Sequence, residues 1–353
     1  MRAARIVEFG APLEVADVPD PEVGSDEVLV KVEAEGICRT DWHTWRGEWG
    51  WIGLEPELPI IPGHEFAGVV VESGSDVTRF RPGDRVTVPF HDGCGLCAWC
   101  TAGRSNLCER MRVIGIAYDG GYAEYVRIPN ADFNAITVPD GIDSDTAAAL
   151  GCRYMTAFHA VVNRGGVRPG DWVAIHGVGG VGLSAVQIAA AIGARPVAVD
   201  LDPIKLELAR QQGAELVVDA SEGDPARMVR DLTGGGAHVS LDALGVAQTC
   251  RNSILSLRRG GRHVQVGLTT GEERGKIPVP IDIIVSFELE VVGSVGNPRS
   301  QFPRLLTMVE SGTLNPDQLI TRRVHLDQAG DVLEEMSEYG TRGFNLITRF
   351  RSA

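Results

Sequence analysis

The sequence predicts an α/β protein in two parts, a β-rich part followed by a doubly wound parallel sheet. Three observations support this prediction. The chain has 353 residues, more than a single hydrophobic core usually organises. Short apolar runs broken by Gly, Pro and Asp fill the residues before about position 150. After Trp172 the apolar runs alternate with helical stretches, which is typical of parallel β-α-β units.

Strands of the β-rich part are expected where apolar residues cluster between turn residues. The clearest segments are Glu27–Ala34, Ala67–Glu72 and Arg85–Pro89. After about Gly293 the pattern becomes helical and ends in an expected strand, Phe344–Phe350. We expect this tail to return to the β-rich part, which divides the chain into residues 1–152, 153–294 and 295–353. The parallel-sheet part is then an insertion in a discontinuous domain.

The parallel-sheet part contains six apolar runs of strand length, and six parallel strands make two mononucleotide-binding halves. The expected strands are Trp172–Ile175, Pro196–Val199, Glu215–Val218, His238–Leu241, Arg262–Val266 and Glu288–Val292. Helical stretches fill the gaps between the first five strands: Leu183–Ile192, Ile204–Gln212, Ala226–Leu232 and Gln248–Leu257.

Charge and composition argue against several classes of function. The net charge is -14, from 33 Lys and Arg against 47 Asp and Glu, which disfavours nucleic acid and anionic membrane surfaces as partners. No apolar run approaches the roughly 18 residues of a membrane span, and the first residues lack the apolar core of a secretory signal. We therefore expect a cytoplasmic protein whose seven cysteines serve metal binding or catalysis rather than disulfides.

A glycine-rich turn follows the first expected strand of the parallel sheet. Gly177-Val178-Gly179-Gly180-Val181-Gly182 has the spacing G-x-G-x-x-G and opens a helix. The first glycine permits the tight turn, the second lets a pyrophosphate approach, and the third lets the helix pack closely on the strand. The N-terminus of that helix offers unpaired N–H groups to the phosphates. The spacing alone is weak evidence, because a purely structural turn can also carry it.

Asp200 strengthens the dinucleotide interpretation because it ends the next expected strand, about twenty residues further on. A carboxylate there accepts hydrogen bonds from the ribose hydroxyls of the adenosine and repels a 2′-phosphate. The sequence therefore predicts NAD over NADP. Lys205 is a candidate for a further ribose contact, and a solvated lysine on a helix surface is the alternative.

The most specific motif is a loop with four cysteines, Cys94, Cys97, Cys100 and Cys108, at gaps of two, two and seven residues. Four thiolates at these spacings make a closed tetrahedral zinc site with no position for a substrate, which predicts a structural role. An iron–sulfur cluster is the main alternative. A zinc ribbon that binds nucleic acid is disfavoured, because Asp92, Glu109 and the acidic chain give no basic surroundings.

Cys38, His64 and Cys152 are scattered along the chain, and each alone is more often a buried thiol or a core histidine. Their settings are distinctive. Cys38 opens the segment Cys-Arg-Thr-Asp-Trp-His after an expected strand, His64 lies in Gly-His-Glu before another, and Cys152 follows Gly151. These segments, the four-cysteine loop and the glycine turn together resemble the zinc-containing medium-chain alcohol dehydrogenases. The resemblance covers essentially the whole chain in matching order.

This resemblance implies a GroES-like catalytic domain, an NAD-binding Rossmann domain and a cleft between them. It also implies two zinc ions per subunit and a homo-oligomer, with a tetramer favoured over a dimer. The implied activity is reversible hydride transfer between a primary or secondary alcohol and NAD. Other zinc dehydrogenases of this superfamily act on polyols, amino alcohols or amino acids, or glutathione adducts. Those substrates stay open as alternatives, as does a non-catalytic scaffold.

The resemblance assigns the catalytic zinc to Cys38, His64 and Cys152, an open set that leaves a fourth position for water or alcohol. It makes Glu65 a nearby carboxylate that is able to approach the metal transiently. It makes Asp41 the residue that orients His64 from behind.

The resemblance also assigns a proton path. Thr40 takes the proton of the alcohol, which passes through the nicotinamide ribose to His43 and then to solvent, while Arg39 contacts the pyrophosphate. Zinc acts here as a Lewis acid, and the hydride acceptor is the nicotinamide. The alternatives are that Thr40 caps a helix and that His43 is a surface residue.

Four tryptophans, Trp42, Trp45, Trp49 and Trp51, fall within ten residues just after Asp41. Two interpretations are open. The tryptophans pack on the core or at a subunit contact, or one or two of them line an alcohol pocket that favours bulky or aromatic substrates.

Overall fold

The computed structural model describes residues 1–269 and 273–351, which form two compact units. Unit 1 comprises Met1–Met155, Gly296–Gly312 and the chain from Pro316 onward. Unit 2 comprises Thr156–Val295 and Thr313–Asn315. Unit 1 carries a mixed sheet and unit 2 a parallel sheet, so the predicted α/β fold class is confirmed.

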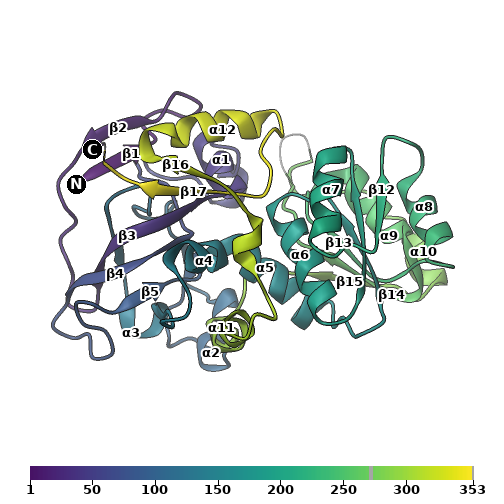
Figure 1. Ribbon diagram of the computed structural model, residues 1–353, viewed down its shortest axis with the longest axis horizontal. Coiled ribbons are helices and arrows are strands. Elements are labelled where there is room, and N and C mark those ends of the chain that lie inside the picture. The colour runs from purple at the N-terminus through teal and green to yellow at the C-terminus, as the bar shows by residue number, and fades with distance from the viewer. Residues whose placement is uncertain (270–272, 352–353) are drawn as a thin grey trace. The chain divides into compact units, whose positions relative to one another are not determined.

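Unit 2 is built on a six-stranded sheet in which all neighbours are parallel (Figure 1). Counted along the unit, the strand order is 3-2-1-4-5-6, the order of doubly wound dinucleotide-binding sheets. The central strands are largely buried because helices cover both of their faces. The strands are β10 (Trp172–His176), β11 (Arg195–Asp200), β12 (Leu216–Asp219), β13 (Ala237–Asp242), β14 (Leu257–Gln265) and β15 (Glu290–Gly293).

Helices flank this sheet on both sides. Helices α6 (Gly180–Ala191) and α7 (Pro203–Gln211) lie on one face, and α8 (Pro225–Leu232) and α9 (Ala247–Leu255) lie on the other (Figure 1). A short helix, α10 (Ile281–Ser286), precedes the edge strand β15.

One strand of unit 2 begins earlier than the sequence predicts. The helix expected to reach Leu257 ends at Leu255, and β14 starts at Leu257 instead of Arg262. Leu257 pairs with Ala237 while Arg262 pairs with Val239, so four residues bulge out of the ladder between them. Two of these are glycines, which are a turn signal in sequence and concealed the strand.

Unit 1 contains a seven-stranded sheet of order β16-β17-β3-β4-β5-β9, with β8 also paired to β3. Its strands are β3 (Val28–Ile37), β4 (Phe66–Ser73), β5 (Arg85–Thr87), β8 (Tyr125–Ile128), β9 (Ile136–Thr137), β16 (Ile320–His325) and β17 (Phe344–Arg349). Two small sheets pair β1 (Arg2–Arg5) with β2 (Glu14–Asp17) and β6 (His91–Asp92) with β7 (Arg112–Val113).

The helices of unit 1 are short. They are α1 (Arg39–Arg46), α2 (Ala98–Thr101), α3 (Ala131–Asn134), α4 (Ser144–Ala149), α11 (Phe302–Glu310) and α12 (Ala329–Ser337). Helix α5 (Met155–Phe158) runs from one unit into the other, between π-helical segments Leu150–Tyr154 and His159–Arg164.

The C-terminal strand β17 pairs antiparallel with β3, so the last part of the chain completes the sheet that the first part begins. Its other neighbour, β16, was not expected from the sequence. β16 alternates exposed and half-buried residues and carries two arginines, so it lacks the apolar run of a central strand. It lies at the edge of the sheet, where such residues are tolerated.

The sheet of unit 1 positions the site. The buried side chains of β3 and β4 pack in one core with Tyr122 and Ile347. β3 ends at Ile37, directly before Cys38, and β4 begins at Phe66, directly after His64 and Glu65. Two of the expected metal ligands are therefore fixed by the ends of neighbouring strands.

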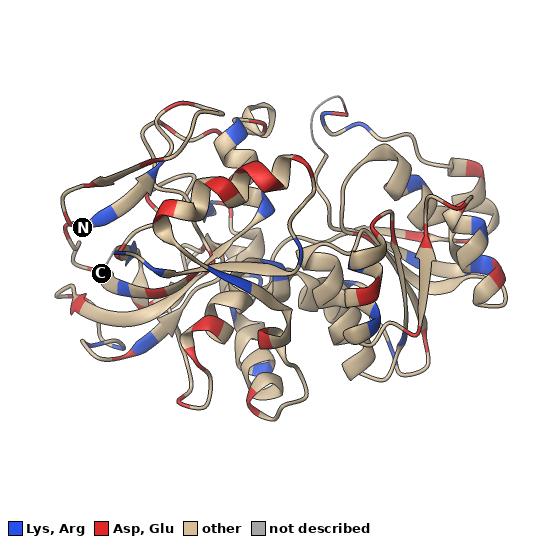
Figure 2. Ribbon diagram, turned by 45° about the horizontal axis from the view of Figure 1, so that its top comes forward, with Lys and Arg blue, Asp and Glu red and all other residues tan. Residues whose placement is uncertain are grey.

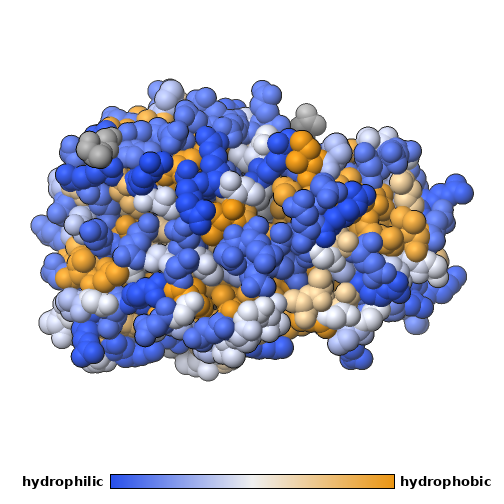
Figure 3. Space-filling model, viewed as in Figure 1, coloured by the Kyte–Doolittle hydropathy of each residue, from blue (hydrophilic) through white to orange (hydrophobic). Residues whose placement is uncertain are grey.

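Acidic and basic residues are interspersed along the ribbon of each unit (Figure 2). Apolar side chains reach the surface at several separate places (Figure 3). Within the described part of the chain, no helix combines the length and apolar character that crossing a bilayer requires.

Candidate metal and nucleotide sites

Cys38, His64 and Cys152 come together in unit 1 although they are far apart in sequence. One ligand atom from each lies within 4.8 Å of the other two, and all three residues are buried. The two sulfur atoms are 4.0 Å apart. Cys38 caps the N-terminus of α1, and Cys152 lies in the π-helical segment Leu150–Tyr154. Two thiols and one imidazole, with no fourth protein ligand in the set, are the donors of an open catalytic zinc site.

Asp41 orients two of these ligands from the first turn of α1. Its Oδ1 lies 2.9 Å from His64 Nδ1, and its Oδ2 accepts the backbone N–H of Cys38 at 2.8 Å. The Tyr122 hydroxyl donates to the same Oδ2 at 3.2 Å. With Nδ1 held in this way, His64 Nε2 is buried and has no hydrogen-bond partner among the described residues. An orphaned imidazole nitrogen beside two thiols fits a metal ion.

The electrostatics of the pocket favour a cation. The Cys152 thiol, followed by His64 and Arg153, holds the pKa of Cys38 well below that of an ordinary thiol despite burial. Burial lowers the pKa of His64, but Asp41 and the Cys38 sulfur more than offset it, and that pKa lies well above its usual value. Cys38 is therefore the sulfur with thiolate character, while the neighbouring Cys38 sulfur and burial raise the pKa of the Cys152 thiol well above the ordinary value.

Glu65 and Arg153 form a buried ion pair directly behind the ligands. The Glu65 carboxylate accepts the backbone N–H of Arg153 at 2.9 Å and its Nε–H at 3.0 Å, and Nη2 donates to the second oxygen. The side chain of Arg153 is 6% exposed, and that of Glu65 is 0% exposed. The resemblance implies that Glu65 is able to approach the metal transiently, and in this structure both of its carboxylate oxygens accept hydrogen bonds from Arg153.

The expected proton path lies on α1. Thr40 and His43 are one helical turn apart, and Thr40 is half-buried. His43 Nδ1 lies 2.9 Å from Glu48 Oε2, and its ring stacks on Trp49 at 4.4 Å. Burial lowers the pKa of His43 to about 4, although Glu48 opposes this shift. His43 is therefore neutral near pH 7, with Nδ1 committed to Glu48.

Arg39 and the tryptophans pack tightly within unit 1. The Arg39 guanidinium stacks over Trp42 at 3.7 Å and over Tyr339 at 4.7 Å, and it donates to the carbonyl of Met336. Trp42 and Trp45 belong to the core, which matches the packing interpretation for these two. Trp51 is 41% exposed.

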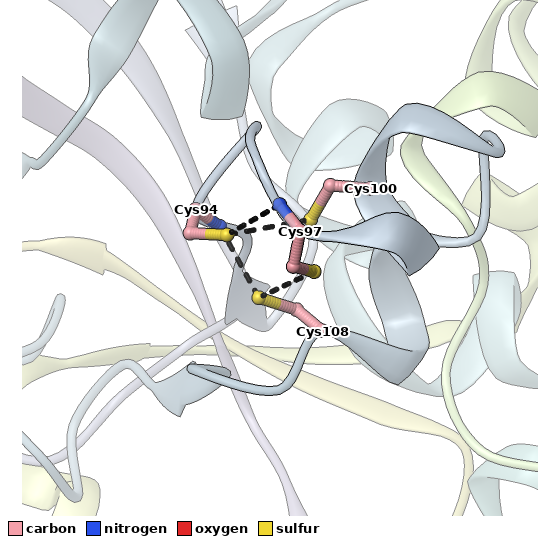
Figure 4. A group of neighbouring side chains, drawn as sticks. All are labelled: Cys94, Cys97, Cys100 and Cys108. Atoms are coloured by element: carbon pink, nitrogen blue, oxygen red, sulfur yellow. Dashed lines mark hydrogen bonds between the residues drawn. The ribbon is translucent and has the colours of Figure 1, made fainter.

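The four-cysteine loop gathers its sulfur atoms around one point (Figure 4). Cys94 and Cys100 have their sulfurs 4.0 Å apart, and those of Cys97 and Cys108 are 3.9 Å apart. Helix α2 positions the middle two cysteines.

Backbone amides support the sulfurs of this loop. Cys94 Sγ accepts the N–H groups of Leu96 and Cys97, and Cys108 Sγ accepts those of Cys94 and Arg110. The two amides lower the pKa of Cys94 to about 6. Amides aimed at sulfur stabilise thiolates, so the loop is prepared to hold a metal ion in a closed site of four sulfurs.

The glycine turn has the backbone that the sequence predicts. Gly177 has a left-handed φ of +84°, which favours glycine. A Cβ at Gly182 would lie 1.9 Å from the carbonyl oxygen of Gly177, so the third glycine is required for close packing. Nothing lies within 4 Å of a Cβ built at Gly179, which leaves open space at the N-terminus of α6. Gly180 and Val181 form the first turn of this helix.

Asp200 ends β11 beside this turn. Its Oδ2 accepts the N–H of Val178 at 2.8 Å, and its Oδ1 accepts those of Leu201 and Asp202 at 2.8 and 3.0 Å. A carboxylate has about four acceptor positions, so roughly one remains for a ribose hydroxyl. Lys205 lies in the first turn of α7 and is only 9% exposed, which disfavours the solvated-lysine alternative.

Three residues that support the metal site were not identified from the sequence: Tyr122, Glu35 and Arg153. Glu35 accepts the backbone N–H of Glu65 at 2.9 Å and is fully buried, which with Asp41 raises its pKa well above the usual value. A signal existed for one of them. Arg153 is a charged residue inside an apolar run, where a charge requires a buried partner.

Two family models match the chain. The alcohol dehydrogenase GroES-like domain matches residues 24–140, and the zinc-binding dehydrogenase model matches residues 180–311. An alcohol dehydrogenase of Geobacillus stearothermophilus is 39% identical over 337 residues, which are 95% of this chain and 96% of that protein. An NAD-dependent alcohol dehydrogenase of Sulfurisphaera tokodaii is 33% identical and covers 98% of this chain and 99% of its own.

A solved structure is also similar to this chain. It is a putative zinc-binding dehydrogenase of Sinorhizobium meliloti bound to NADP, with 36% identity and a TM-score of 0.85. The match covers 98% of both chains. Relatives with NAD and with NADP in their descriptions therefore share this fold.

Proposed function

This chain belongs to the zinc-containing medium-chain dehydrogenase/reductase family, and from that premise we propose that it is a zinc- and NAD-dependent alcohol dehydrogenase. It interconverts a primary or secondary alcohol with the corresponding aldehyde or ketone. The observation that carries the proposal is the buried set Cys38, His64 and Cys152, whose donor atoms converge from three separate segments. A closed structural site would have a fourth protein ligand, and this set has three.

Cys38, His64 and Cys152 hold the catalytic zinc in this proposal. The orphaned Nε2 of His64 and the thiolate character of Cys38 fit the ion. Bound zinc supplies Lewis acidity, which lowers the pKa of an alcohol hydroxyl as it lowers that of water. Asp41 keeps the imidazole in the tautomer that presents Nε2, and the buried walls of the pocket exclude bulk water.

Thr40 and His43 move the proton. As the half-buried hydroxyl of Thr40 accepts the alcohol proton, it releases its own proton toward His43, and His43 delivers a proton to solvent. Because Nδ1 of His43 is hydrogen-bonded to Glu48, the nitrogen that exchanges protons is Nε2. Because burial lowers the pKa of His43 to about 4, the ring is neutral near pH 7 and passes on any proton that it receives.

Unit 2 holds the dinucleotide. The amides at the start of α6 bind the pyrophosphate, and Asp200 and Lys205 bind the adenosine ribose. NAD is favoured because the Asp200 carboxylate repels a 2′-phosphate. Cys94, Cys97, Cys100 and Cys108 hold a second zinc with a structural role, which gives two zinc ions per subunit.

The test is NADH formation on a panel of primary, secondary, polyol, amino and aromatic alcohols. Activity that a zinc chelator abolishes and added zinc restores supports the proposal. A strong preference for a polyol or an amino alcohol would support the assignment as a zinc dehydrogenase but would change the proposed substrate. Bound zinc and NAD without turnover of any alcohol or glutathione adduct would contradict the enzymatic proposal and favour a scaffold.

We also propose a homo-oligomer, with a tetramer favoured, located in the cytoplasm. Strand β15 is a sheet edge, and Val291 on it is 47% exposed, while Ile281 and Val285 on α10 are 60% and 71% exposed. An edge strand with exposed apolar neighbours is a surface on which copies of a chain associate. Light scattering on the purified protein tests the oligomeric state, and a monomer would refute the proposed homo-oligomer. Two cysteine sites that need reduced thiols suit the cytoplasm.

A further inference from the structure

The buried Arg153–Glu65 ion pair joins two metal-ligand segments. Glu65 directly follows His64, and Arg153 directly follows Cys152. The pair includes a backbone bond, from the N–H of Arg153 to Glu65 Oε1 at 2.9 Å, as well as the guanidinium bonds. A shift of either ligand segment would therefore stretch several hydrogen bonds at once.

Glu65 is closely packed on two sides, by Gly36 and by Gly151. A Cβ built on Gly36 would lie 2.1 Å from Glu65 Oε2, and one on Gly151 would lie 2.7 Å from Glu65 Cα. The backbone of Glu65 is held as well, by the N–H of Gly36 at 2.9 Å and by the carboxyl of Glu35 at 2.9 Å.

Arg153 is held equally firmly. Its guanidinium lies 4.0 Å from the centre of the Phe344 ring, on strand β17. Its side chain is 6% exposed, and Glu65 is its ion-pair partner among the described residues. A buried guanidinium keeps its carboxylate partner because separating the two would leave both charges uncompensated.

We propose that Arg153 is a positioning residue with two effects on the metal site: it braces the His64 and Cys152 segments, and it prevents Glu65 from becoming a metal ligand. This inference rests on the proposed zinc site of Cys38, His64 and Cys152. The brace lowers the rate at which the ion leaves. The restraint on Glu65 keeps the fourth position of the ion for the alcohol.

The experiment uses Arg153→Gln, Arg153→Lys, Glu65→Gln and the double variant Arg153→Gln/Glu65→Gln, with Arg323→Gln as the control. Arg323 pairs with Asp145 in the same unit but is 53% exposed, so its loss removes a comparable charge from an exposed ion pair. Two properties are measured: zinc release to a chromogenic chelator, and the visible spectrum of the cobalt(II)-substituted protein. Cys38→Ser identifies the release phase and the spectral bands that belong to the catalytic site.

Arg153→Gln is expected to accelerate zinc release about 10- to 100-fold, the usual effect of losing a residue behind a metal ligand. It also changes the cobalt spectrum toward higher coordination, because Glu65 is freed. The double variant releases zinc as fast but keeps the wild-type spectrum, since an amide replaces the carboxylate. Arg153→Lys keeps the spectrum and has an intermediate release rate, and Arg323→Gln behaves as wild type.

Wild-type release and a wild-type spectrum in folded Arg153→Gln would overturn the inference. If that variant does not fold, zinc release from the double variant and from Arg153→Lys tests the bracing effect. Release from both at the wild-type rate would refute it. A purely structural role would lower stability without changing either metal property. Should Cys38→Ser retain the full cobalt spectrum and zinc content, the proposed catalytic site itself fails, which is distinct from a failure of the brace.

Discussion

A buried histidine of unit 2 should make the protein less stable in mild acid. His176 ends β10 directly before the glycine turn and is 1% exposed. Its Nε2 lies 3.3 Å from Ser256 Oγ, and burial, followed by the neighbouring His263, lowers its pKa to about 3. Replacing it by asparagine keeps a polar group for Ser256 and removes the titration. His176→Asn therefore separates this histidine from every other titrating group.

The expected size follows from the two pKa values. Unfolded histidine has a pKa of about 6.5, so the unfolded chain binds a proton that the folded chain does not between about pH 6.5 and pH 3. The contribution of His176 is fully present above pH 6.5 and is lost as the pH falls toward 3. At about 1.4 kcal/mol per pH unit, the loss from pH 7 to pH 5 is about 2 kcal/mol.

The assay is equilibrium urea unfolding of the zinc-loaded protein at pH 7 and at pH 5, followed by circular dichroism. Wild type should lose about 2 kcal/mol more than His176→Asn between these conditions. Carboxylates and the metal sites titrate in both proteins and cancel in the difference. An equal loss in the two proteins would refute the reasoning, because it would mean that His176 is protonated in the folded state or already neutral in the unfolded one.

Three further predictions concern the sites. Thr40→Ala should lower kcat about 10²- to 10⁴-fold with zinc content and the Kd for NAD unchanged, because it removes one proton carrier; unchanged steady-state kcat would exclude Thr40 from the relay. Asp200→Ala should raise the ratio of kcat/KM with NADP to that with NAD at least about tenfold, since the repelling carboxylate is lost, and an unaltered ratio would contradict its assigned role. Cys100→Ser should reduce zinc from two ions to one per subunit by elemental analysis and lower Tm, while undiminished zinc would argue against a metal in the four-cysteine loop.

Much of the fold was predictable because its signals are local. Apolar runs bounded by turn residues located β10, β11 and β12 to within one or two residues. The ligand sets were predictable for different reasons. The four-cysteine loop follows from spacing alone, whereas Cys38, His64 and Cys152 needed the resemblance, since no spacing connects residues so far apart.

What the sequence did not reveal depends on partners that are distant along the chain. Strand β16 is stabilised by pairing with β17, and its own residues resemble a surface loop. Arg153 and Glu65 are 88 positions apart, and the sequence around either residue does not indicate that the other is its partner. Local pattern predicts where a charge is unusual, and only the fold says what neutralises it.

The pairing of β17 with β3 has a consequence for biosynthesis. On the ribosome, unit 2 emerges as an almost uninterrupted stretch, Thr156–Val295, and can acquire its core while later residues are still being made. Unit 1 cannot be completed at that stage, because β17, one of the three strands that pair with β3, is translated some 300 residues after it. Nascent chains therefore carry reduced thiols on an incomplete sheet for most of translation.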